Sequence, residues 1–163
     1  MLDDFTRLKV HFEQVAAEHN LDSFQLFHKI NGNHPVPCSV FCKRLSPLES
    51  VVKFLHEQFG YSFTEIAKML GRSPKTIWQT AHNAMRKYPE HFILSQEFMI
   101  PASIFSQREK SIFRAAVSYL HDEYKLSFAK IAKLTERDQR SVWATYHRDS
   151  RKNTKTNKVC IKK

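Results

Sequence analysis

The chain has 163 residues, a formal net charge of +10 and a pI of about 9.7. No apolar run approaches the roughly 18 residues of a membrane-spanning helix, and no signal-peptide pattern opens the sequence, so we expect a cytosolic protein rather than a membrane protein. The three cysteines, Cys38, Cys42 and Cys160, are odd in number and lack metal-ligand spacing, which favours free thiols in the cytoplasm.

The first 35 residues predict a pair of helices. Over residues 3–18, Phe5, Leu8 and Phe12 recur on one side of an amphipathic helix, and residues 21–30 form a second, short apolar helix. Turn-forming residues at 31–35 then mark a boundary. We expect this pair to pack on the segment that follows; the alternative is a module for dimerisation or for docking a partner.

Three helices are predicted over residues 36–88. Ser46, Pro47 and Glu49 form a capping set that begins a helix ending near Phe59. Two shorter helices follow within residues 62–87, with caps at Ser62 and Ser73 and a glycine between them. Helix, short turn and helix is the helix-turn-helix pattern.

The chain then repeats this pattern. Residues 127–152 match residues 62–87 without a gap at a shift of 65, with eleven of 26 positions identical. The segment 100–105 (IPASIF) also echoes 36–41 (VPCSVF). We expect Ser106 and Glu109 to cap a helix that runs to Tyr124.

These elements predict an all-α fold in which two tandem three-helix helix-turn-helix domains follow an N-terminal helical pair. The expected boundaries are 1–35 for the pair, 36–88 and 100–152 for the two domains, and 153–163 for a basic tail. The tail lacks periodicity, so we expect it to be disordered until bound.

The first helix-turn-helix resembles region four of bacterial sigma factors. The resemblance is carried by the opening E-I-A-K, a cap before the second helix, Ile77, Gln79 and the closing A-M-R-K. It implies a domain that reads the −35 promoter element, and small sigma-like helix-turn-helix proteins of prokaryotes share it. This sequence departs from the pattern at Arg72 and at two tryptophans, and nothing in it resembles the sigma region that binds the −10 element.

The start of the second helix of a helix-turn-helix enters the major groove of DNA, while the first helix crosses the backbone. The expected base contacts are Lys75, Thr76, Gln79, Gln139, Arg140 and Ser141. The expected phosphate contacts are Lys68, Arg72, Arg86, Lys87, Lys133, Arg137, Arg148, Arg151 and Lys152. For each residue the alternative is an ordinary solvated helix face. Trp78 and Trp143 are expected at the core edge, with a sugar-phosphate contact as the alternative.

Charge supports nucleic acid as the partner. Residues 137–163 carry nine basic and two acidic side chains, whereas residues 1–35 carry three basic and five acidic ones. The favoured function is a sequence-specific regulator of transcription that binds double-stranded DNA in the nucleoid. The alternatives are a sigma-like factor with RNA polymerase as partner, and a helical protein adaptor; a homodimer through the N-terminal helices stays open. Catalytic motifs are absent from the sequence, so we expect neither an enzyme nor a cofactor.

Overall fold

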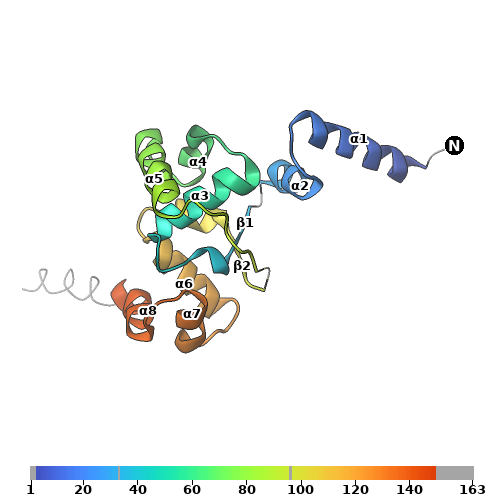
Figure 1. Ribbon diagram of the computed structural model, residues 1–163. Helices are drawn as coiled ribbons and strands as arrows, with labels where there is room; N and C mark the ends of the chain where they lie inside the picture. Colours follow the sequence, from blue (N-terminus) through green and yellow to red (C-terminus); the bar gives the residue numbers. More distant parts are fainter. Residues whose placement is uncertain (1–2, 33, 96, 150–163) are drawn as a thin grey trace, which may run out of the picture.

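The computed structural model describes residues 3–32, 34–95 and 97–149, in which one small sheet lies at one side of a body of helices (Figure 1). The helices are α1 (Asp4–Glu18), α2 (Ser23–Asn31), α3 (Pro47–Phe59), α4 (Phe63–Met69), α5 (Pro74–Lys87), α6 (Ile112–Asp122), α7 (Phe128–Leu134) and α8 (Gln139–Tyr146). The strands are β1 (Pro35–Pro37) and β2 (Met99–Pro101), and short 3-10 helices lie at η1 (Cys38–Val40), η2 (Ala102–Ser106) and η3 (His147–Asp149). The predicted all-α fold class is confirmed.

Helices α3, α4 and α5 form the first unit, and the expected caps define its ends. Ser46 and Glu49 form a reciprocal capping box at α3, and Ser62 and Glu65 form another at α4. Gly60 ends α3 in the left-handed conformation, at φ 63°. The three helices enclose a buried apolar interior because each turns one hydrophobic face inward.

Helices α6, α7 and α8 form the second unit, with one correction to the predicted boundaries. The prediction that Ser106 caps α6 is wrong: Ser106 ends η2, and Ser111 is the cap, accepting from the N–H of Arg114 at 3.3 Å. Ser111 lies 65 positions after Ser46. Starting α6 there directs Ile112 and Phe113 into the core, which determines the register.

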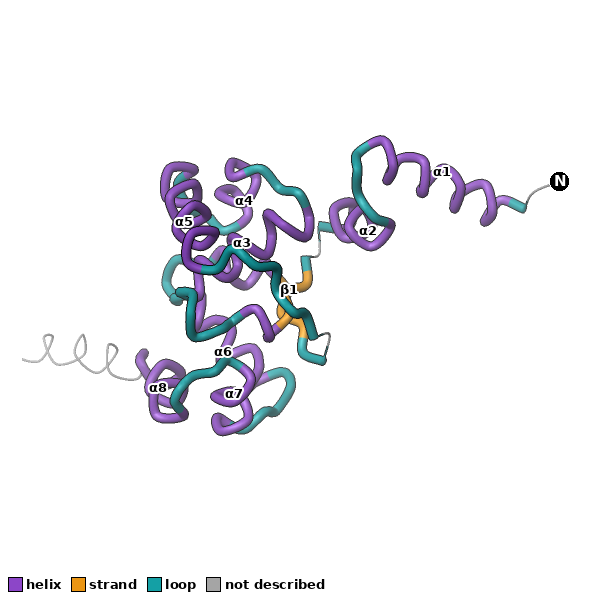
Figure 2. Tube along the Cα trace, in the orientation of Figure 1, coloured by secondary structure: helices purple, strands orange, loops and turns teal. Residues whose placement is uncertain are grey.

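The two units share one hydrophobic core. Strands β1 and β2 pair antiparallel across the junction, and α3 packs against α6 (Figure 2). Phe41 and Leu55 from one side and Phe105 and Leu120 from the other belong to the same buried cluster. The division into domains 1–35, 36–88, 100–152 and 153–163 stays a prediction, and the last of these lies outside the described residues.

The N-terminal pair is attached through α2. The side-chain amide of Gln25 donates to the carbonyl of Gln58, and the Lys29 ammonium lies 4.8 Å from the centre of the Tyr61 ring. Helix α1 extends away from the rest of the molecule (Figure 1), leaving Phe5 and Leu8 exposed at 77% and 63%. The predicted packing on the first unit is therefore made by the second helix of the pair.

The described cysteines, Cys38 and Cys42, are free thiols. Burial, with a smaller contribution from the charge of Glu97, raises the pKa of Cys38 to about 12. Cys160 lies outside the described residues.

Candidate nucleic-acid interface

Helix α5 presents the expected base contacts of the first unit to solvent. The Ser73 hydroxyl accepts from the N–H of Thr76 at 3.2 Å and begins the helix together with Pro74. Buried Ile77, Ala81 and Ala84 fix the rotation of the helix about its axis. Because these residues face the core, the side chains of Lys75, Thr76 and Gln79 are exposed on the other side.

Helix α8 repeats this arrangement in the second unit. The Asp138 carboxylate accepts from the N–H of Ser141 at 3.1 Å, and Val142 and Thr145 are buried. Gln139, Arg140 and Ser141 are exposed. Figure 1 places α5 and α8 toward the same side of the molecule, opposite the sheet and the N-terminal pair. The expected base contacts are thus accessible in both units, although contact with DNA stays a prediction.

The expected phosphate contacts divide into four groups. Lys68, Arg86, Lys133 and Arg148 are exposed. Lys87 is exposed too, but its ammonium lies 2.7 Å from the Glu49 carboxylate. Arg72 and Arg137 are partly buried, and Arg151 and Lys152 lie outside the described residues. The first group is therefore the best placed to meet a DNA backbone.

Arg137 is engaged within the molecule. Its guanidinium donates to the Leu45 carbonyl at 3.2 Å and lies 4.8 Å from the centre of the Phe113 ring. The Nε atoms of Arg137 and of its counterpart Arg72 are buried without a hydrogen-bond partner among the described residues. Both turn arginines thus point inward, and a phosphate contact by either stays a prediction.

The prediction for the two tryptophans concerned their place at the core edge and did not include their contacts with histidine rings. Trp78 and Trp143 are 48% and 47% exposed, so each lies at the rim of its unit rather than in the core. Each ring stacks on a histidine one turn later, with centroid separations of 3.9 Å to His82 and 4.2 Å to His147. The spacing W-x-x-x-H in both copies was the sequence signal for this pair, because residues four apart are neighbours on a helix.

These stacks extend the exposed faces of α5 and α8 with flat aromatic surface. A hollow of about 430 Å³ at the start of α8 is lined by Asp138, Gln139, Arg140 and Trp143. Two expected base contacts, Gln139 and Arg140, therefore line the same hollow as the exposed indole of Trp143. An aromatic side chain can make an apolar contact with a thymine methyl group in a major groove. The exposed indole at the start of α8 is placed for such a contact.

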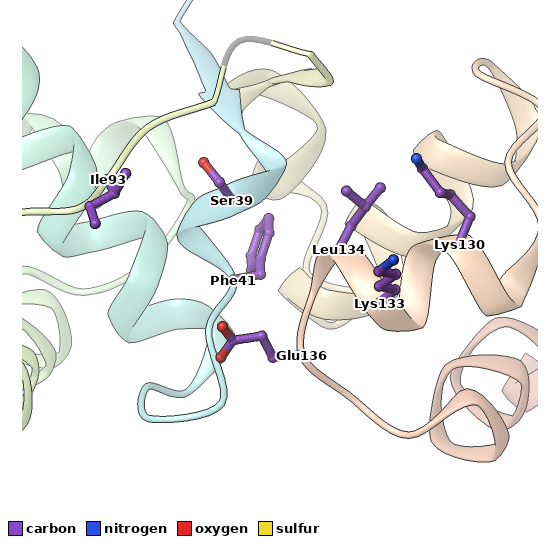
Figure 3. Close-up of a pocket in the computed structure, with 7 residues that line it drawn as sticks. All are labelled: Ser39, Phe41, Ile93, Lys130, Lys133, Leu134 and Glu136. Atoms are coloured by element: carbon purple, nitrogen blue, oxygen red, sulfur yellow. The ribbon is translucent and has the colours of Figure 1, made fainter.

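A second hollow of about 430 Å³ lies where the two units meet (Figure 3). Its walls are Ser39 and Phe41 from the first unit's entry, Ile93 from the linker, and α7 with the following turn. Lys133, an expected phosphate contact, borders this junction.

Within the described residues, no cluster of histidine, cysteine, aspartate and glutamate side chains is arranged to ligate a metal ion. None of the described helices has the length and apolar character to span a bilayer.

Comparisons with known proteins agree with this geometry for the first unit. Residues 43–87 match the family model described as Sigma-70, region 4. Over 78 residues the chain is 35% identical to the probable ECF RNA polymerase sigma factor SigI of Mycobacterium tuberculosis, in strains CDC 1551 / Oshkosh and ATCC 25618 / H37Rv. That match covers 48% of this chain and 24% of each relative, so the chain spans about a quarter of the length of the curated relatives it matches. No solved structure matches significantly.

Together these matches support a DNA-binding, transcription-related protein. The family model covers the first unit alone.

Proposed function

We propose that this protein is a sequence-specific, double-stranded-DNA-binding regulator of transcription that uses two helix-turn-helix units in one chain. One observation carries the proposal: each unit buries one face of a capped second helix and exposes polar, hydrogen-bonding side chains at its start. We place the protein in the cytoplasm at the nucleoid and assign it no enzymatic activity.

We infer that the second unit is a second copy of the domain found in the first. The caps Ser46, Ser62 and Ser73 recur as Ser111, Ser127 and Asp138, each 65 positions later. The tryptophan-histidine stack recurs at the same shift. Equal spacing of caps, turns and aromatic pairs is what a duplicated domain retains.

In the proposed complex each recognition helix enters a major groove by its N-terminal turn. Arg140 is suited to the O6 and N7 acceptors of guanine, and Gln79 to the N6 and N7 edge of adenine. Lys68, Arg86, Lys133 and Arg148 would contact phosphates, which fix register without reading sequence.

Selection of bound fragments from a random duplex pool, followed by titration of the enriched site, tests this proposal. Arg140→Ala should cost about 1–3 kcal/mol of binding and relax preference at one base position. Lys9→Ala, an exposed lysine on α1, is the matched control and should bind like wild type. If no duplex is preferred over random sequence, the proposal is wrong.

Salt dependence provides a second measurement on the enriched site. Four phosphate contacts predict an affinity loss of about a hundredfold between about 50 and 200 mM salt, because the slope of affinity against salt is about −0.9 per neutralised phosphate. An affinity that is flat across this range would contradict a phosphate-dominated interface.

The sigma matches favour one second candidate, a factor that docks one unit on RNA polymerase and the other on DNA. Retention of core polymerase by the immobilised chain, in the absence of DNA, would favour it over the first proposal. A third candidate, a protein adaptor or a homodimer joined through α1, draws on the exposed Phe5 and Leu8. An adaptor would keep its partner when the charges of Lys75 and Arg140 are reversed.

A further inference from the structure

The small sheet has the symmetry of a two-fold axis. Val36 pairs with Ile100, and these residues hold the same place in the segments VPCSVF and IPASIF. Outside the strands, the N–H of Cys38 donates to the carbonyl of Phe98 at 2.9 Å, and the N–H of Ala102 donates to that of His34 at 2.9 Å. Ala102 lies 64 positions after Cys38, and His34 lies 64 positions before Phe98. The two bonds are therefore equivalent when the two segments are exchanged. Exchange of the two segments therefore leaves the pairing unchanged.

The same exchange relates contacts elsewhere at the junction. The equivalent rings of Phe41 and Phe105 pack edge to face with centroids 6.2 Å apart. Arg108 of the second unit contacts the turn between α4 and α5 in the first unit. Its Nε donates to the Gly71 carbonyl at 2.5 Å. In the second unit the turn between α7 and α8 reaches back, through Arg137, to the Leu45 carbonyl. Each turn thus rests on the loop that leads into the other unit's first helix.

These contacts describe an isologous interface, the kind that joins two subunits of a symmetric dimer, formed here within one chain. Its axis passes between α3 and α6, so it also relates α5 to α8. Helix α5 packs on α3, α3 on α6, and α6 on α8. Three such steps of 8–10 Å set an upper limit of roughly 24–30 Å on the distance between the axes of α5 and α8, which is of the same order as the about 34 Å between equivalent major-groove faces one turn apart.

We propose that the chain reads two half-sites in inverted orientation, on one face of a duplex and about one helical turn apart. This inference rests on the proposed DNA binding and adds the arrangement of the target. The half-sites are unlike, because Lys75, Thr76 and Gln79 in α5 correspond to Arg140, Ser141 and Ala144 in α8.

Making the two recognition helices alike tests the orientation. The variant Arg140→Lys, Ser141→Thr and Ala144→Gln changes exposed positions, so the fold is expected to persist. Its target, selected from a random duplex pool, should become a perfect inverted repeat. The reciprocal variant, Lys75→Arg, Thr76→Ser and Gln79→Ala, should select a different inverted repeat and replaces the first if that chain does not fold.

The possible outcomes distinguish a wrong arrangement of half-sites from a failure of the proposed DNA binding. A direct repeat, or a single unrepeated motif, overturns the inverted arrangement while DNA binding stands. If wild type enriches no sequence at all, the proposed function fails, and the arrangement fails with it.

Spacing gives a second readout on wild type. Inserting half a turn, about 5 bp, between the selected half-sites rotates one of them to the far side of the duplex. Affinity should then fall by about a hundredfold or more, to that of a single unit. An equal affinity at both spacings would mean that the two units are not held in the arrangement described here.

Discussion

Glu49, at the start of α3, is a buried carboxylate held by hydrogen bonds. It accepts from the Lys87 ammonium at 2.7 Å and from the N–H of Ser46 at 2.8 Å. Burial alone would raise the pKa of Glu49, but these hydrogen bonds outweigh it and hold the pKa below its ordinary value of 4.5. A lowered pKa means that this stabilisation is present above the ordinary pKa and is lost as pH falls through the lowered one.

We therefore predict that Lys87→Met lowers the free energy of unfolding at neutral pH by about 0.5–1 kcal/mol, a modest value because the lysine is half exposed. The loss should shrink as Glu49 becomes protonated, below about pH 4. Urea unfolding at pH 7 and pH 3 measures both effects. Arg86→Met is the matched control, because Arg86 occupies the same helix end without a buried carboxylate partner among its described contacts. Equal losses from the two variants would show that the ion pair contributes nothing.

At the scale of the element, the turns of the two helix-turn-helix units adopt the same left-handed backbone conformation with different residues. Gly71 and Glu136 both have positive φ, at 61° and 50°. A Cβ on Gly71 would lie 3.0 Å from the Ser106 carbonyl oxygen, so this turn requires glycine. In the other turn the Glu136 carboxylate accepts from the N–H of Lys43 at 3.3 Å, which helps to offset the strain.

We predict that Gly71→Ala destabilises the protein more than Gly60→Ala does, by on the order of 1 kcal/mol. Both glycines have nearly the same φ, so both variants carry the left-handed cost. At Gly60 the nearest atom to the added methyl is a Leu21 methyl 4.0 Å away, an ordinary contact. Chemical denaturation of the two variants isolates the clash with Ser106, and equal midpoints would contradict it.

The same elements show how far the sequence predicted the fold and the site. Caps such as Ser46, Ser62 and Ser73 are local signals, so the helix starts could be predicted from a few neighbouring residues. At α6 the box-like spacing of Ser106 and Glu109 predicted the wrong start, because Ser111 is followed by neither proline nor glutamate.

The inward direction of Arg72 and Arg137 could not be predicted from the sequence. It depends on how the units meet, and the contacts there join residues that are distant in the chain, such as Leu45 and Arg137, which are 92 positions apart. Local pattern contains no signal for such a contact. The exposed base-contact candidates, by contrast, follow from the buried face of a single helix.

At the scale of the whole molecule, a common core implies that the two units fold together. Phe41, Phe105 and Phe113 form ring contacts across the junction, at centroid distances of 6.2 and 6.4 Å. Separating the units would expose these rings and the edges of both strands. Such surface is costly to leave in water, so one unit stabilises the other.

We predict a single cooperative unfolding transition. The chain has two tryptophans, one on each recognition helix, so Trp143→Phe leaves Trp78 to report on the first unit and Trp78→Phe leaves Trp143 to report on the second. Urea titrations followed by fluorescence should give coincident midpoints, after correction for the stability of each variant by circular dichroism. Two midpoints separated by more than the error of the fits would show that the units unfold independently.

The self-matching strand pair has a consequence for how the protein acts when it is scarce. A symmetric regulator built from separate subunits dissociates on dilution, and its activity then depends on how many copies are present. Here residues 88–98 tether one half to the other, so the halves meet at a high effective concentration whatever the abundance of the protein. A single molecule therefore already contains both helix-turn-helix units in contact with one another.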